Sequence, residues 1–258
     1  MLRAILSLLS LACLALMCAL ATNCGGSSGS GGGGCTGGPY DVVGDWTLNV
    51  TGSGGGSGPG LINSAGLAVF FENSVPLVTV TLPAITGTCS FTGTATAYAA
   101  NGQTATDTVQ GNVNSATSIS GKISNGNTFS LVPNTPLTGS VTALSGSGWE
   151  GELEGETIGL LPLTFTPSGN YQSMSVAGTE AGCSVSGTFN QEVGSSTNVF
   201  DVSLTFSGAS GCLVGTVSGL GYEASSDYFG INGGASGTYL YAISSGGAEV
   251  MEVYKPAP

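Results

Sequence analysis

The sequence contains no histidine, and only three of its 258 residues are basic. Without histidine, the Ser-His-Asp and Cys-His systems of nucleophilic catalysis are excluded. The shortage of lysine and arginine argues against binding of nucleic acid and of anionic lipid headgroups, since both need clustered positive charge. No CxxC pair, phosphate-binding loop or EF-hand spacing is present. We therefore expect a protein that is not an enzyme, with no catalytic residues, no metal and no cofactor.

Acidic residues number 15, and four of them alternate along the stretch GWEGELEGET at 148–157. On a β-strand, the glutamates from Glu150 to Glu156 share one face, while Trp149 and Leu153 take the other. Neighbours roughly 7 Å apart repel by only about 0.6 kcal/mol in water, but a dry interior would not tolerate them. We expect this row to face solvent. A bridging Ca²⁺ ion and a glycosidase acid/base pair are the alternatives.

The first 23 residues predict a signal peptide, because Arg3 precedes an apolar run from Ile5 to Ala21. Cys24 follows, and the Gly/Ser-rich segment 24–38 predicts a flexible tether. This junction resembles that of bacterial lipoproteins, in which a lipid-modified cysteine becomes the first residue. The resemblance implies lipid attachment at Cys24, although Asn23 stands where the family has a small residue. A secreted protein cleaved after Ala21 is the alternative.

Four cysteines then remain in the exported part of the chain: Cys35, Cys89, Cys183 and Cys212. An even number in an exported protein predicts two disulfides. We favour Cys183–Cys212, which are close in sequence, and hence Cys35–Cys89 by elimination. Removal of the leader also leaves 15 acidic residues against Lys122 and Lys255, a net charge of −13.

The body of the chain alternates Val, Ile, Leu, Phe, Tyr and Thr with Gly, Ser and Asn, which is typical of an all-β protein. We predict an antiparallel meander barrel or a β-sandwich built from two related halves, 39–145 and 146–258, and leave open whether these form one barrel or two. The first half is expected to have strands at 42–50, 66–72, 75–82, 88–98, 116–123, 127–132 and 137–144. The second is expected to have them at 149–157, 160–166, 170–177, 182–190, 198–207, 212–218, 236–243 and 247–254.

The halves echo each other in two places. Each opens with one of the only two tryptophans, Trp46 and Trp149, and Cys89-Ser-Phe-Thr-Gly-Thr is matched by Cys183-Ser-Val-Ser-Gly-Thr. These segments, with the Cys-Gly-Gly-Ser start, resemble a group of exported Gly/Ser/Thr-rich bacterial lipoproteins with two such halves. The resemblance implies attachment to the membrane through an N-terminal lipid in the cell envelope. It implies no activity.

Large aromatic residues are expected to fill the core, with Trp46 and Trp149 at the ends of the barrels. If a pocket exists, its lining is expected from Tyr222, Tyr228, Phe229, Tyr239 and Tyr241. We expect a lipid-anchored envelope protein that binds a small apolar or glycan ligand. A purely structural or surface-display lipoprotein is the nearest alternative, and a carboxylate-dependent glycosidase follows it. The sequence identifies neither the ligand nor a protein partner.

Overall fold

The computed structural model describes residues 40–72, 77–87, 89–134, 144–153, 161–168, 173–180, 182–191, 199–210, 212–224 and 237–256. The predicted signal peptide and tether, with Cys24 and Cys35, lie outside these residues. Among the described residues, no helix has the length and apolar character needed to span a membrane.

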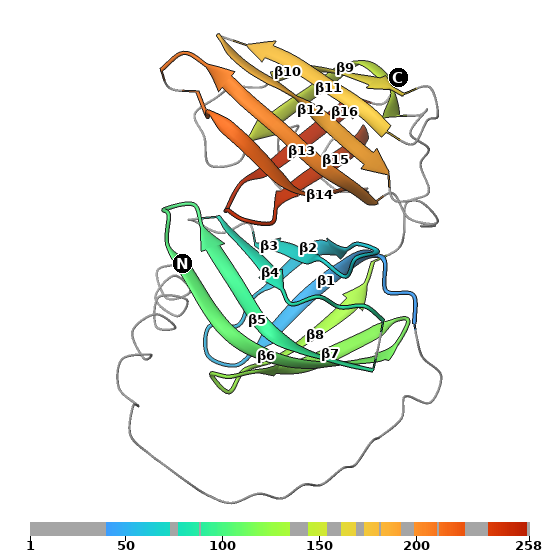
Figure 1. Ribbon diagram of the computed structural model, residues 1–258, viewed down its shortest axis with the longest axis vertical. Helices are drawn as coiled ribbons and strands as arrows, with labels where there is room; N and C mark the ends of the chain where they lie inside the picture. Colours follow the sequence, from blue (N-terminus) through green and yellow to red (C-terminus); the bar gives the residue numbers. More distant parts are fainter. Residues whose placement is uncertain are drawn as a thin grey trace, which may run out of the picture.

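The first half of the chain forms a closed, eight-stranded antiparallel barrel in which each strand pairs with the next and β8 pairs with β1 (Figure 1). Its strands are β1 (Gly44–Thr51), β2 (Ser57–Ile62), β3 (Ala68–Glu72), β4 (Val78–Leu82), β5 (Ser90–Ala99), β6 (Thr104–Ser115), β7 (Ser118–Ile123) and β8 (Thr128–Pro133).

The second half repeats this up-and-down architecture, and β16 closes its barrel against β9. Its strands are β9 (Gly146–Leu153), β10 (Leu161–Pro167), β11 (Ser173–Glu180), β12 (Cys183–Gln191), β13 (Val199–Gly208), β14 (Gly215–Ala224), β15 (Gly237–Ser244) and β16 (Val250–Pro256). The predicted fold class is thus confirmed, and the structure decides between its alternatives: the halves are two separate barrels.

Two strands were missed by the sequence analysis. The sequence of β2, SGPGLI, is rich in residues that disfavour strands, and β6, TATDTVQGNVNS, has few large apolar residues. In β2 the glycines permit close packing, since a Cβ on Gly60 would lie 2.1 Å from the Val69 carbonyl oxygen. The predicted strand at 137–144 lies outside the described residues except for Leu144.

The sequence echo only partly matches the strand order. Trp46 and Trp149 both lie on the first strand of their barrel, and both are buried in its core. The cysteine motifs are not equivalent, because Cys89 immediately precedes the fifth strand, β5, whereas Cys183 begins the fourth strand, β12. The Trp-to-Cys spacing is nine residues shorter in the second half, which is about the length of one strand.

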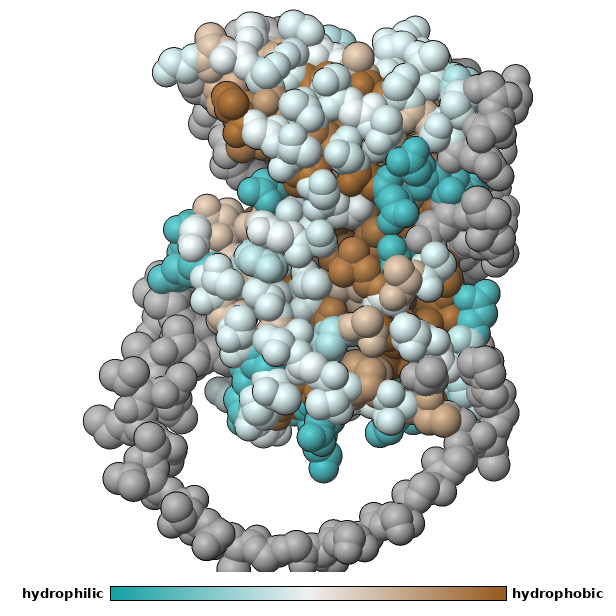
Figure 2. All heavy atoms as spheres, in the orientation of Figure 1, coloured by the Kyte–Doolittle hydropathy of each residue, from teal (hydrophilic) through white to brown (hydrophobic). Residues whose placement is uncertain are grey.

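Strands β2 and β3 of the first barrel face β14 and β15 of the second (Figure 1). An apolar cluster joins the outer faces of β2 and β3 to those of β14, β15 and β16. Asn63 Nδ2 donates a hydrogen bond to Asp201 Oδ1 at 3.2 Å across the boundary, and Thr81 Oγ1 donates to the Ser245 carbonyl oxygen at 3.2 Å. Most of the visible surface has intermediate hydropathy, and hydrophobic residues show where the barrels meet and in smaller patches on each barrel (Figure 2).

The predicted disulfide Cys183–Cys212 is present, with Cα atoms 5.5 Å apart. It lies against Gly208, which has a φ of 152° and whose added Cβ would lie 2.6 Å from the Cys212 sulfur. Glycine is required there because both the backbone conformation and the packing exclude a side chain. Cys89 is also disulfide-bonded, and its predicted partner Cys35 lies outside the described residues.

Replacing both Cys183 and Cys212 with alanine is expected to lower the free energy of unfolding of the second barrel. The bond spans 29 residues, and the chain-entropy model gives about 3–4 kcal/mol for a loop of this length. Urea denaturation under non-reducing conditions measures the change. An unchanged transition midpoint would contradict the expectation.

Candidate functional site

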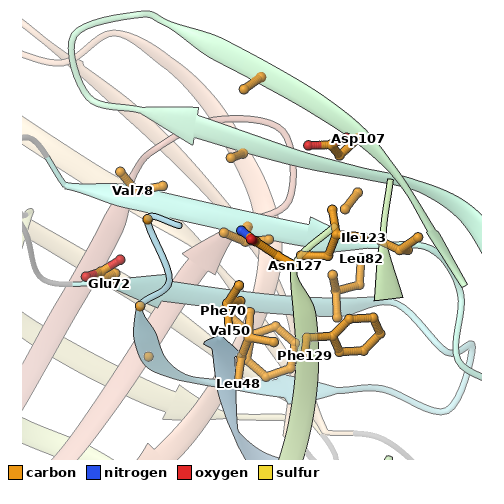
Figure 3. A pocket seen from close by; sticks show the side chains of 18 of the residues that line it. Leu48, Val50, Phe70, Glu72, Val78, Leu82, Asp107, Ile123, Asn127 and Phe129 are labelled. Carbon is orange, nitrogen blue, oxygen red and sulfur yellow. The ribbon is translucent and has the colours of Figure 1, made fainter. Parts of the chain in front are cut away.

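The interior of the first barrel contains a cavity of about 120 Å³ that is partly open to solvent. Its wall is mainly aliphatic and aromatic, and Figure 3 shows Leu48, Val50, Phe70 and Phe129 gathered at one side of it. The cavity lies toward the end of the barrel where the β1–β2, β3–β4, β5–β6 and β7–β8 turns are found, because residues from these turns or the adjoining strand ends line it. The opposite end is filled, with Trp46 donating a hydrogen bond from Nε1 to the Val42 carbonyl oxygen at 2.9 Å.

Small residues on opposite strands create this space. Gly58 of β2 and the preceding Gly56 line the cavity, and so do Ala95 and Ala97 of β5 and Ala105 of β6. In a closed barrel of eight strands, β2 lies across from β6, so small side chains here leave a gap that no neighbouring residue fills.

The second barrel is filled by large residues. Its interior holds a chain of aromatic rings, with centroids 5.2 Å apart for Trp149 and Phe165, 5.4 Å for Phe165 and Phe189, and 6.0 Å for Phe189 and Phe200. The cavity found among its inward residues measures only about 10 Å³, which is at most the space of one water molecule. Of the two interiors, as far as their described residues show, the first is the one with room for a ligand.

Polar side chains stand at the rim of the first cavity. Glu72 lies at the end of β3, Asp107 lies on β6, and Ser57, Asn125 and Asn127 complete the rim. The two acids come from strands on different sides of the cavity (Figure 3). The arrangement combines an apolar interior with an acidic mouth, as in pockets that take up the apolar part of a ligand and orient its polar end.

Hydrogen bonds to neighbouring residues fix the rim side chains Asp107 and Asn127 but not Glu72. Asp107 accepts hydrogen bonds from the Ser124 hydroxyl and, at 3.4 Å, from Asn125 Nδ2. Asn127 Nδ2 donates to the Ser53 carbonyl oxygen at 3.0 Å and ties together the β1–β2 and β7–β8 turns. Among the described residues, no donor reaches the Glu72 carboxylate, and burial alone raises its pKa above the ordinary value.

A larger space of about 330 Å³ lies where the β5–β6 turn of the first barrel faces the β15–β16 turn of the second. Glycine, alanine and polar residues form most of its lining, and Tyr98 is the single aromatic side chain there. It lacks an apolar wall that could hold a ligand, so we regard it as the junction between the barrels.

The three described members of the predicted aromatic pocket lining are not among the residues that line the cavity of the first barrel. Tyr222, Tyr239 and Tyr241 are buried between the barrels, where the rings of Phe71 and Tyr241 stack with centroids 5.8 Å apart. Tyr228 and Phe229 lie outside the described residues. The sequence could not distinguish a pocket from an interface here, because both require aromatic side chains on a covered face.

The glutamate row faces outward where the structure describes it. Glu150 is exposed and Glu152 is partly exposed, whereas Trp149, Gly151 and Leu153 are buried inside the barrel. Glu154 and Glu156 lie outside the described residues. Glu252, which was not singled out from the sequence, is fully buried and lies in register with Glu152.

Asp45 on β1 is a carboxyl group with a strongly perturbed titration. Burial raises its pKa from 3.8 to about 7, although Asn134 Nδ2, at 2.8 Å from Oδ1, and the Trp46 backbone oppose the shift. Such a pKa is typical of catalytic acids. Asp45 does not line the cavity, however, and Asn134 also accepts a hydrogen bond from Thr47 Oγ1 at 2.8 Å, so the group ties β1 to the end of β8.

The stability of the first barrel is expected to fall as pH rises from about 4 to about 7 because of Asp45. In this window the folded state keeps a proton that the unfolded chain has lost, so the folded state binds more protons and each increase in pH favours unfolding. Asp45→Asn retains the hydrogen-bond acceptor and should flatten this part of the profile. The check is thermal unfolding of both proteins from pH 4 to pH 8, and identical pH profiles would contradict the assignment.

Comparison with protein-family models, with curated proteins and with solved structures gave no match to this chain. The site found by structure was not among the residues singled out from the sequence. Its signal was present in the Ala95-Thr-Ala97 and Thr104-Ala105-Thr stretches, where small residues alternate with threonine. Small inward residues on neighbouring strands indicate a hollow only once the strands are known to close into a barrel.

Proposed function

We propose that the first barrel binds a small apolar molecule and that the chain presents it from a lipid anchor in the cell envelope. The apolar cavity of about 120 Å³ carries the binding proposal. An engineered dry cavity of roughly 150 Å³ in another protein accepts benzene or xenon, so this space suits a single ring or a short alkyl chain. The wall offers aliphatic contacts below the rim, which favours an apolar ligand over the glycan also expected from the sequence.

The residues that line the cavity favour a glycosidase less than they favour binding of an apolar ligand. Glu72 and Asp107 are the two carboxylates that face one cavity, as such an enzyme requires. The wall beneath them is Val, Leu, Ala and Phe, which cannot donate hydrogen bonds to sugar hydroxyl groups. A non-catalytic binding role fits this surface better.

The second barrel suits a structural role. Among its described residues the core leaves space for at most a water molecule, and its outer face buries tyrosines against the first barrel. We propose that it supports the binding barrel, so that the structural function considered from the sequence belongs to one half of the chain.

The lipid-anchor proposal is supported by the bonded state of the cysteines. Cys183–Cys212 and the bonded Cys89 are typical of an oxidising compartment outside the cytoplasm. Mass spectrometry of the mature N-terminus, without reduction, is expected to find an acylated Cys24, and a Cys24→Ser variant should lose the lipid mass and leave the membrane fraction. An unmodified chain beginning at Thr22 would establish the secreted alternative instead.

The cavity proposal predicts binding of benzene to the first barrel alone. Methyl resonances of Ala95, Ala97 and Ala105 should shift saturably with a dissociation constant near 1 mM, since about five or six buried carbons at ~0.8 kcal/mol each give roughly 4–5 kcal/mol. The methyl group of Ala242, in the filled core of the second barrel, should not shift.

A cavity-filling variant provides the matched test. Ala97→Leu should abolish the benzene shifts and raise stability by about 0.5–2 kcal/mol, because the added side chain occupies the space that the ligand needs. Thr94→Leu makes a similar addition at an exposed position of the same strand and should leave binding intact. Equal shifts in both barrels, or binding that survives Ala97→Leu, would contradict the proposal.

A further inference from the structure

The mouth of the cavity carries two acids and no basic residue to balance them. Beyond Arg3 in the leader, Lys122 and Lys255 are the only cations in the sequence. Lys122 is exposed on β7 between Gly121 and Ile123, which take the inward positions. Lys255 belongs to the second barrel, where its Nζ lies 5.3 Å from the centroid of the Trp149 ring and 3.3 Å from the Ser145 carbonyl oxygen.

Both acids belong to the inward face of their strands. Phe70 and Glu72 alternate with Val69 and Phe71, whose side chains pack in the cluster between the barrels. On β6, Asp107 alternates in the same way with the exposed Thr106 and Thr108. The two carboxylates therefore lie above the apolar wall and not on the outer surface of the barrel.

The two acids differ in what already surrounds them. Asp107 accepts hydrogen bonds from Ser124 and Asn125, which fix its orientation. Glu72 is half-buried, and no donor among the described residues reaches it. Its Oε2 lies close to the backbone of Gly56, where an added Cβ would be 2.6 Å away, so the β1–β2 turn also shields it from water. A half-desolvated carboxylate without a donor favours a ligand that supplies a donor or a positive charge.

We infer that the first barrel selects a cationic amphiphile: an alkyl or aryl amine whose apolar part fills the cavity and whose ammonium group lies at the rim near Glu72 and Asp107. This inference rests on the proposed function, because it identifies the chemical class of the ligand for the same cavity. The ammonium group gives the Glu72 carboxylate the charge-assisted hydrogen bond that the chain itself does not. A fatty acid of the same length would place its carboxylate against two like charges, with no lysine or arginine nearby.

Three ligands with six-carbon chains separate the contribution of the head group from that of the tail. Hexylamine, 1-hexanol and hexanoate carry a positive, a neutral and a negative head at neutral pH. Calorimetric titration of the full exported chain is expected to find the amine bound about tenfold more tightly than the alcohol, the equivalent of about 1.4 kcal/mol, and the carboxylate bound more weakly than both.

Substitutions at the rim test whether the acids cause this order. Glu72→Gln should reduce the preference for hexylamine over 1-hexanol to about twofold or less, and Asp107→Asn should reduce it partly, with 1-hexanol affinity unchanged in each. Retained 1-hexanol binding also shows that each variant is folded. Glu150→Gln removes an exposed carboxylate from the second barrel and should keep the full preference.

The outcomes separate the two proposals. If 1-hexanol binds as tightly as hexylamine, the inference about the cationic head is wrong and the apolar cavity stands. If Glu150→Gln lowers the preference as much as Glu72→Gln, the preference comes from the net charge of the chain and the assignment to the rim is overturned. If none of the three binds, the proposed function fails together with this inference.

Discussion

The size of the inward side chains decides what each of these barrels can do. Closing eight strands fixes the diameter, so the interior must be filled by side chains or left hollow. In the second barrel Trp149, Phe165, Phe189 and Phe200 fill it. In the first, glycines of β2 and the β1–β2 turn and alanines of β5 and β6 leave about 120 Å³ near one end. The same architecture thus forms one barrel with an internal cavity and one barrel with a filled core.

Strands β3 and β4 line the cavity with one face and contact the second barrel with the other. On β4, Val78 and Val80 line the cavity, whereas Thr79 and Thr81 donate hydrogen bonds to the carbonyl oxygens of Gly247 and Ser245 in the second barrel. On β3 the outward Val69 and Phe71 pack against its tyrosines. The second barrel therefore holds β3 and β4 of the first barrel in place, which makes it harder for these strands to move into the cavity.

The sequence predicted the all-β class, the eight strands of the second half, the outward direction of Glu150 and the Cys183–Cys212 bond, since all follow from alternation and spacing. It missed β2 and β6, which lie opposite each other across the cavity. Their small inward residues create the hollow and also remove the apolar alternation that identifies a strand. Alternation also could not reveal that Tyr239 and Tyr241 face a second barrel, because it shows which residues share a face but not what covers that face.

The difference between the two interiors can be measured without knowing the natural ligand. Xenon enters dry apolar cavities of about this size and scatters X-rays strongly. Crystals of the full exported chain under xenon pressure should show a xenon atom among Phe70, Ala97 and Phe129 in the first barrel, and none inside the aromatic core of the second. An empty first barrel with its wall collapsed, or xenon in both barrels, would contradict the account.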